Sequence, residues 1–307
     1  MFKKIINLTK QTFNWKYLCG LLLSGILVLF LIGVEKNSVH TLNKQQYSIN
    51  KIIKQNRNQI ISHQQKNITH SNYKNVSKNA KVSEYIAARN HYSKTIQKSM
   101  IGQLTIPSVH INLPVFSGMS NAALLNGVGT FSKKRSMGQG NFVMMAHNLP
   151  AQYSDALLQP LSQIKPKAKI RITDFNNVYT YEASYKNIVD SSNIKLLGQT
   201  HKSIVTLFRC VGEHGTNNRL IVQGNLISSH PYQQKNQNNL PSQTSSIAIP
   251  KRSNFDNFNL KMFQWLDLTG DFQKDILQFI IACLPAIITI VVLGKKIIWN
   301  LKKESAQ

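Results

Sequence analysis

Two long apolar stretches without a formal charge stand apart from the rest of the chain. The first covers residues 17–34 and the second residues 276–294, where Gln278 and Pro285 interrupt the apolar pattern. At a rise of about 1.5 Å per residue, a helix of this length crosses a hydrocarbon core about 30 Å thick. A proline is tolerated in such a helix. The pattern predicts two transmembrane helices; buried core helices, or a signal peptide for the first stretch, are the alternatives.

Basic residues predict how these two helices are oriented. Lysines lie on both sides of the first stretch, whereas the second is preceded by a mixture of Lys and Asp and followed by Lys295, Lys296, Lys302 and Lys303. The positive-inside rule then puts the C-terminus in the cytoplasm, and two spans return the N-terminus to the same side. We therefore expect a two-pass protein of the cell membrane, with cytoplasmic tails at 1–16 and 295–307 and an extracellular segment at 35–275.

The expected extracellular segment begins and ends with polar sequence. Residues 35–82 are rich in Asn, Gln, Lys and Ser without a sustained apolar period, which predicts a polar, partly helical stalk. Residues 228–275 resemble it in composition and predict a second polar linker. An apolar stripe between Ser83 and Met100 predicts a short amphipathic helix with Ser83 as its N-cap.

The sequence between these polar regions consists of short β-like runs broken by Gly, Pro and Asn. Strands packed this densely predict a mostly β fold, a closed barrel with short helices, which would make 83–227 the folded domain. A helix is expected at Tyr153–Ile164. The candidate strands are Ile101–Ile106, Leu113–Phe116, Asn141–Ala146, Lys169–Thr173, Val178–Ile188, Ile204–Phe208 and Arg219–Leu226.

Composition narrows the classes of partner. The chain of 307 residues has 37 Lys and Arg against 12 Asp and Glu, a formal net charge of +25, so anionic partners are plausible. Because most of this charge falls in the segment predicted to be extracellular, wall polymers or lipid head groups fit better than nucleic acid, and no nucleic-acid-binding motif is present. Three cysteines exclude both a disulfide-stapled scaffold and a zinc site of four thiolates.

Cys210 is the one cysteine in the expected extracellular segment, since Cys19 and Cys283 fall in the predicted spans. It follows an apolar run at the end of a candidate strand, and it is either a buried structural residue or a nucleophile. A catalytic cysteine needs a base as partner and a donor for the oxyanion that forms on acyl attack.

His147 and Arg219 are the candidates for those two roles. His147 ends an apolar run at a strand-to-loop junction, where a scaffold strand can aim a side chain into a site; a hydrogen-bonded, half-buried histidine is the alternative. Arg219 follows Cys210 by nine residues across a Gly-containing loop, a spacing that predicts a hairpin with the two residues facing each other. Its guanidinium would offer several fixed donors.

These residues resemble the sortase family. TLFRC (Thr206–Cys210) with the downstream Arg219 is similar to the signature TLxTC and its strand arginine, and Met-Ala-His (Met145–His147) is similar to the family's histidine motif. Residues Ile111–Phe131 are similar to the class A pattern. The resemblance implies a sortase-type barrel over 83–227, a cysteine transpeptidase activity without a cofactor, and His147, Cys210 and Arg219 as catalytic residues.

The resemblance also implies the reaction and its partners. Cys210 would attack the Thr–Gly carbonyl of an LPxTG-like sorting signal, His147 would protonate the leaving amine, and Arg219 would hold substrate and stabilise the oxyanion. The acyl group would then pass to an amine of a cell-wall precursor or to a pilin lysine. Thr206, Leu196 and Leu197 are weaker candidates for the substrate groove, with ordinary core packing as the alternative.

The sequence departs from the sortase pattern at several positions, and some of these departures indicate to which class of sortase it is most similar. Arg209 replaces the usual Thr before the cysteine, and Met145-Ala146 replace smaller residues before the histidine. The loop Ser132–Gly140 is basic, so we expect no calcium or other metal site. The second span resembles class C, pilus-type members, but residues 35–100 contain neither Asp nor Pro, which excludes their lid motif. A pilin-polymerising sortase, a cysteine hydrolase of the same fold and a non-enzymatic, membrane-tethered binder of anionic wall polymer remain as alternatives.

Overall fold

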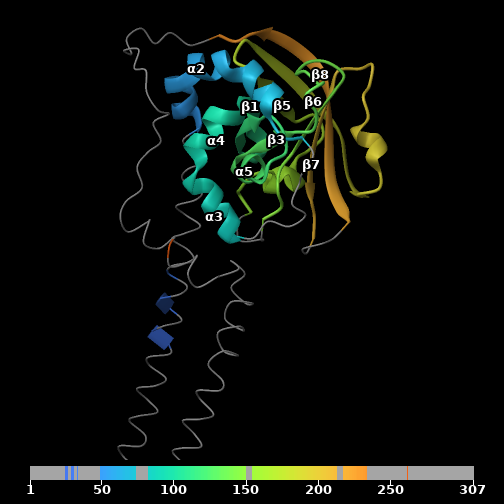
Figure 1. The fold of residues 1–307 in the computed structure, drawn as a ribbon. Helices are drawn as coiled ribbons and strands as arrows, with labels where there is room; N and C mark the ends of the chain where they lie inside the picture. The colour runs from blue at the N-terminus through green and yellow to red at the C-terminus, as the bar shows by residue number, and fades with distance from the viewer. Residues whose placement is uncertain are drawn as a thin grey trace, which may run out of the picture.

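The computed structural model describes residues 25–26, 29–30, 33, 49–73, 82–149, 154–212, 217–233 and 261. Within these ranges the chain forms a closed β-barrel with helices packed against one side (Figure 1). None of the helices in the described residues is both long and apolar enough to span a membrane. The predicted span at 276–294, most of the one at 17–34 and both predicted tails lie outside the described residues.

Helices precede the barrel and strands build it. The helices are α2 (Ile49–His70), α3 (Val82–Asn90), α4 (Tyr92–Ser99) and α5 (Asn121–Asn126). Short 3-10 helices lie at η1 (Pro107–Val109), η3 (Gln159–Gln163) and η4 (Ile194–Leu197). The strands are β1 (Met100–Ile106), β2 (Ile111–Phe116), β3 (Val128–Thr130), β4 (Asn141–Met145), β5 (Lys169–Thr173), β6 (Asn177–Asp190), β7 (Ile204–Cys210) and β8 (Asn218–Pro231).

The strands close on themselves in the order β1-β2-β3-β4-β7-β8-β6-β5, with β5 pairing β1. Two ladders are parallel, β2 with β3 and β4 with β7, and the others are antiparallel. Closure leaves no long unpaired edge within the barrel. The expectation of a mostly β, closed barrel with short helices is therefore confirmed.

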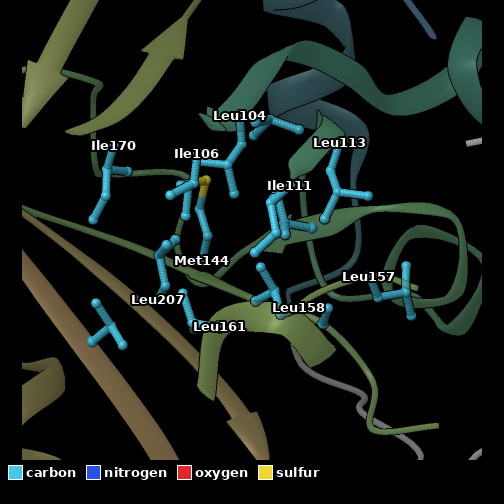
Figure 2. Packing of buried hydrophobic residues seen from close by; sticks show 14 of the residues in the cluster. Leu104, Ile106, Ile111, Leu113, Met144, Leu157, Leu158, Leu161, Ile170 and Leu207 are labelled. Carbon is cyan, nitrogen blue, oxygen red and sulfur yellow. The ribbon is translucent and has the colours of Figure 1, made fainter. Parts of the chain in front are cut away.

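The barrel interior is a continuous apolar core. Figure 2 shows Leu104, Met144 and Leu207 from three different strands converging on it, and Leu158 and Leu161, at η3, approaching from one end. All of these side chains are fully buried. Burying each contributes about 1.5–3 kcal/mol relative to exposure, so this core carries much of the stability of the domain.

Helix α2 lies where we expected a polar stalk. Ile49, Ile52, Ile53 and Ile60 recur at helical spacing and are buried against α4, β1 and β2. Polar side chains of the same helix bind the barrel backbone; Asn67 Nδ2 donates to the Met100 carbonyl oxygen at 3.1 Å. Residues 49–70 of the predicted stalk are thus part of the folded domain, because a sparse isoleucine stripe is enough to bury one face of a helix that is otherwise polar.

Other boundaries also differ from the sequence-based expectation. The helix predicted between Ser83 and Met100 is split at His91 into α3 and α4, and Ser83 is the second residue of α3, not the residue before it. The described part of the helix expected at Tyr153–Ile164 is the short 3-10 helix η3. Strand β8 continues past residue 227, because β6 pairs with it as far as Asn177 opposite Pro231. The rest of the predicted linker, apart from residues 232–233 and 261, lies outside the described residues.

Candidate active site

The barrel places Cys210 and Arg219 on the neighbouring strands β7 and β8, and His147 just beyond the end of β4, which pairs with β7 on its other side. Strands β4 and β7 are parallel and their ladder ends with Met145 opposite Phe208; His147 and Cys210 each follow two residues beyond this last pair. In the antiparallel ladder of β7 and β8, Cys210 is the direct partner of Arg219. Directly opposed residues project to the same face of a sheet. The hairpin expected from the spacing of Cys210 and Arg219 is therefore present.

His147 is buried, with 5% of its surface exposed, just beyond the end of β4. Its Nε2 atom lies 3.1 Å from Oδ1 of Asn121, and its backbone N–H donates to the Leu124 carbonyl oxygen at 3.2 Å. Burial lowers the pKa of His147 to about 4, and the charge of Glu84 opposes this shift. The imidazole is consequently neutral at pH 7, with one nitrogen available as a base.

Cys210 is a free thiol and is only half-buried, in contrast with Leu207 and Phe208 in the same strand. Its backbone is fixed on both sides: β8 pairs with it through Arg219, and the N–H of the next residue, Val211, donates to the Asn218 carbonyl oxygen at 3.0 Å. A half-buried thiol at a fixed strand end fits a nucleophile better than a core residue.

Arg219 is half-buried at the start of β8. Its Nη1 atom donates to the Asn218 carbonyl oxygen at 3.0 Å. Hydrogen bonds from Ser192, and to a lesser degree the charge of Arg219, hold the pKa of the Asp190 carboxyl below its usual range. The guanidinium thus brings positive charge to the end of the hairpin that carries the thiol.

An apolar cluster covers the same face of these strands, which we call the apolar face. It consists of Met119, Leu124, Val143, Met145, Phe208 and Ile221, with Leu196 and Leu197 packed against it. Side chains alternate along a strand, so Met144 and Leu207 point into the barrel while Met145 and Phe208 point outward. By the same alternation Cys210 and Arg219 lie on the side of the apolar face. It therefore borders the candidate catalytic residues.

Thr206 differs from its expected place in the substrate groove. Its side chain is 0% exposed, and its Oγ1 donates to Asn141 Oδ1 at 2.7 Å and accepts from Gln223 Nε2 at 3.0 Å. The two amides in turn donate to the Leu196 carbonyl oxygen, each at 3.1 Å. Thr206 is therefore the centre of a polar network that fastens η4 to the barrel. Leu196 and Leu197 lie half-exposed in η4 beside the apolar face, and their place in the substrate groove stays a prediction.

Three polar residues of this site were not among the sequence-based candidates for it. Asn121 orients His147, Glu84 acts on the imidazole through its charge, and Asn148 binds the side chain of Arg209. The sequence holds a weak indication of Asn121. Ser120 is a residue type suited to cap a helix, and its hydroxyl oxygen accepts the Ala123 N–H, so Asn121 begins the helix. Within the part of the chain that the structure describes, no three His, Cys, Asp or Glu side chains are grouped as metal ligands.

Comparisons with known proteins find similar sequences over the barrel. The family model "Sortase domain" matches residues 104–227. Sortase A of Listeria monocytogenes is 30% identical over 128 residues, covering 42% of this chain and 57% of the relative. Sortase A of Streptococcus agalactiae is 33% identical over 138 residues and is matched over 56% of its length. The chain thus spans little more than half the length of these two relatives.

A shorter relative is covered almost completely. The Bacillus subtilis protein YwpE, itself assigned to the sortases, is 34% identical over 97 residues, which make up 32% of this chain and 93% of that protein. The crystal structure of Listeria monocytogenes sortase A overlaps 45% of this chain and 93% of its own, with 28% identity and a TM-score of 0.43. From the family match and the near-complete coverage of a relative at this identity, the chain belongs to the sortase family.

Proposed function

We propose that this protein is a membrane-anchored cysteine transpeptidase that cleaves an LPxTG-like sorting signal between Thr and Gly and joins the new acyl group to an amine of a cell-wall precursor. The observation that carries the proposal is that Cys210 is paired directly with Arg219 in the β7–β8 ladder, while His147 follows two residues after the end of β4, the other neighbour of β7. The apolar face beside them suits the Leu and Pro side chains of such a signal. Membership of the sortase family supplies the class of substrate.

In the first half-reaction the thiol proton of Cys210 passes to the neutral imidazole of His147. The thiolate sulfur bonds to the Thr carbonyl carbon, and the carbonyl electron pair moves to the oxygen beside the Arg219 guanidinium. Collapse breaks the C–N bond, and the imidazolium donates its proton to the leaving Gly amine. Because burial gives His147 a pKa of about 4, the imidazolium exists only during turnover and is a strong acid toward that amine.

In the second half-reaction an incoming amine completes the exchange. Its nitrogen attacks the thioester carbonyl carbon while its proton passes to His147. The C–S bond then breaks, and Cys210 regains a proton from the ring. A thioester retains the acyl-transfer potential of the cleaved peptide bond, so no nucleotide and no other cofactor is required.

Membrane anchoring is part of this proposal. It is supported by the apolar stretches at 17–34 and 276–294 and by the lysines that follow the second. Two spans would hold the barrel outside the cell, next to membrane-held substrates and lipid-linked acceptors, and so raise their effective concentration. Reporter fusions at residue 307 should report a cytoplasmic end and fusions near residue 235 an external one. An external C-terminus would overturn the topology.

The activity is tested with the full-length chain in detergent micelles and an LPxTG peptide, with and without triglycine as amine. We expect a thioacyl adduct on Cys210 by mass spectrometry and, with triglycine, the ligated product; Cys210→Ala should give neither. Release of the free acid despite excess amine would instead identify a cysteine hydrolase, and ligation only to a pilin lysine peptide would identify a pilin-polymerising enzyme. Absence of any adduct, together with retention on anionic wall polymer that Cys210→Ala leaves unchanged, would identify a non-enzymatic binder.

A further inference from the structure

Arg209 is a buried arginine directly beside the candidate nucleophile. In the β7–β8 ladder it pairs with Leu220, so it projects to the opposite side of the sheet from Cys210. It is 8% exposed, and burial lowers the pKa of its guanidinium. Among the described residues its Nε atom has no hydrogen-bond partner. A buried cation that is incompletely bonded is a poor source of stability, so its presence calls for another reason.

The bonds that Arg209 does make connect the segments that carry His147 and Cys210. Its Nη1 atom donates to Asn148 Oδ1 at 2.8 Å and to the Cys210 carbonyl oxygen at 2.9 Å. Its Nη2 atom lies 3.4 Å from the Gln159 carbonyl oxygen in η3. One planar guanidinium therefore contacts Asn148, which follows His147, the backbone of Cys210 and the backbone of Gln159.

Two further contacts extend this connection. Asn148 Nδ2 lies 3.4 Å from the carbonyl oxygen of Gly212, two residues beyond Cys210. Gln159 Nε2 donates to the Leu149 carbonyl oxygen, so η3 also holds the segment that follows His147. Strand β4 ends at Met145, so the β4–β7 ladder does not itself reach His147. Contacts outside this ladder therefore fix the spacing of ring and thiol, and besides the backbone bond of His147 to Leu124 they come from side chains.

We propose that Arg209 is a positioning residue that sets the separation of the His147 imidazole and the Cys210 thiol by bridging Asn148 and the Cys210 carbonyl. This inference rests on the proposed function, in which the ring takes the thiol proton. Loss of the bridge lets His147 drift relative to Cys210, and a displacement of about 1 Å can lower a rate by about 100-fold. Substrate contacts on the apolar face are untouched, so the loss falls on kcat and not on KM.

The test compares Arg209→Met, Arg209→Lys and His147→Ala in the full-length chain. Arg57→Met is the matched control, because Arg57 also donates to a backbone carbonyl, that of Phe175, and stacks on Tyr232 at the far end of β8. The readout is the rate of Cys210 alkylation by iodoacetamide against pH, followed in the peptide that contains Cys210. This readout needs no sorting signal, so it remains decisive if no LPxTG peptide is turned over.

We expect Arg209→Met to change the pH profile of alkylation in the same way as His147→Ala, and the double variant to change it no further. Arg209→Lys should behave like Arg209→Met, since one ammonium cannot reproduce the planar fork. On an LPxTG peptide, kcat should fall 10- to 100-fold with KM within about threefold, and the Tm should not fall. A wild-type alkylation profile in Arg209→Met would overturn the proposal. So would a wild-type profile in Arg209→Lys, because it would show that the positive charge alone is sufficient.

A second variant keeps the inference testable if Arg209→Met does not fold. Asn148→Ala removes the acceptor of the bridge while Arg209 keeps its bond to the Cys210 carbonyl oxygen. It should alter the alkylation profile in the same direction as His147→Ala. An unaltered profile in a folded Asn148→Ala variant would show that the bridge does not position the ring.

Discussion

The Nε2 atom of His147 lies 3.1 Å from the Oδ1 atom of Asn121, the first residue of α5. The helix end is itself fixed, since the Ser120 hydroxyl oxygen accepts the Ala123 N–H at 3.3 Å. With Oδ1 as the acceptor, Nε2 carries the ring hydrogen and Nδ1 keeps its lone pair. A residue remote in sequence thus determines which nitrogen of His147 is free to act as a base.

Asn121→Ala should therefore impair proton transfer. A hydrogen bond of this kind contributes about 1 kcal/mol, so we expect kcat on an LPxTG peptide to fall about 5- to 10-fold with KM unchanged. The control is Asn112→Ala, which removes a half-buried amide, remote from the site, that accepts from Gln103. Equal kcat in the wild type and Asn121→Ala would show that the ring does not depend on this contact.

The buried imidazole should make stability depend on pH. The unfolded chain takes up a proton at His147 near pH 6.5, whereas the folded chain does so only near pH 4. The free energy of unfolding should therefore fall as the pH drops through this window, by at most about 3 kcal/mol. Urea unfolding at pH 7 and pH 4.5 measures it. His147→Gln should lose less stability than the wild type over this range, and parallel losses would contradict the assignment.

Cys210 and Arg219 should be separable by their effects on turnover and folding. Cys210→Ala removes the covalent path and should abolish turnover. Arg219→Lys should lower kcat about 100- to 1,000-fold, because a single ammonium does not reproduce the fork that faces the oxyanion. Both variants should keep a Tm close to wild type, as should the control Arg171→Lys on the exposed side of β5. Wild-type turnover in Arg219→Lys would remove Arg219 from the site.

Helix α2 should contribute to the stability of the barrel. Ile52 is 0% exposed, so Ile52→Ala should lower the free energy of unfolding by about 2–5 kcal/mol. Lys54→Ala, on the exposed side of the same helix, should change it by less than about 0.5 kcal/mol. A free stalk would give the same small effect for both substitutions, and chemical denaturation distinguishes the two cases.

Thr206 should support η4 without touching substrate. Thr206→Val leaves the buried amide of Asn141 and the half-buried amide of Gln223 without their shared partner and should cost about 1–3 kcal/mol of stability. Loosening of η4 should also raise KM, because Leu196 and Leu197 pack beside the apolar face. Thr200→Val, in an exposed turn, is the control. A raised KM without any loss of stability would favour direct contact between Thr206 and substrate.

The sequence was sufficient for most of the barrel but not for its small elements. Short β-like runs broken by Gly, Pro and Asn predicted seven of the eight strands in the described residues. Strand β3 was missed because Val128–Thr130 is too short to show a period, and α5 because its six residues make fewer than two turns. Helix α2 was misjudged because asparagine and glutamine outnumber the isoleucines that it buries. Tertiary packing outweighed local composition there.

The candidate site was predictable where it depends on strand register. His147, Cys210 and Arg219 each sit at a strand end, and motif spacing identified them. The residues that orient them were not predictable in this way, since Asn121 meets His147 and Asn148 meets Arg209 only through the fold. The departure at Arg209 was visible in the sequence, but its direction away from the thiol followed only from the register with Leu220.

Strand β7 pairs with β4 on one side and with β8 on the other, so the order in which these pairings form decides when the candidate site is assembled. The hairpin partner of β7 is near in sequence, but β4 is far away, and such distant parallel pairings form late. Until β7 docks beside β4, the chain carries a cysteine with no base next to it. Under the proposed function, turnover therefore requires that β7 has docked beside β4, and the onset of activity would report completed folding.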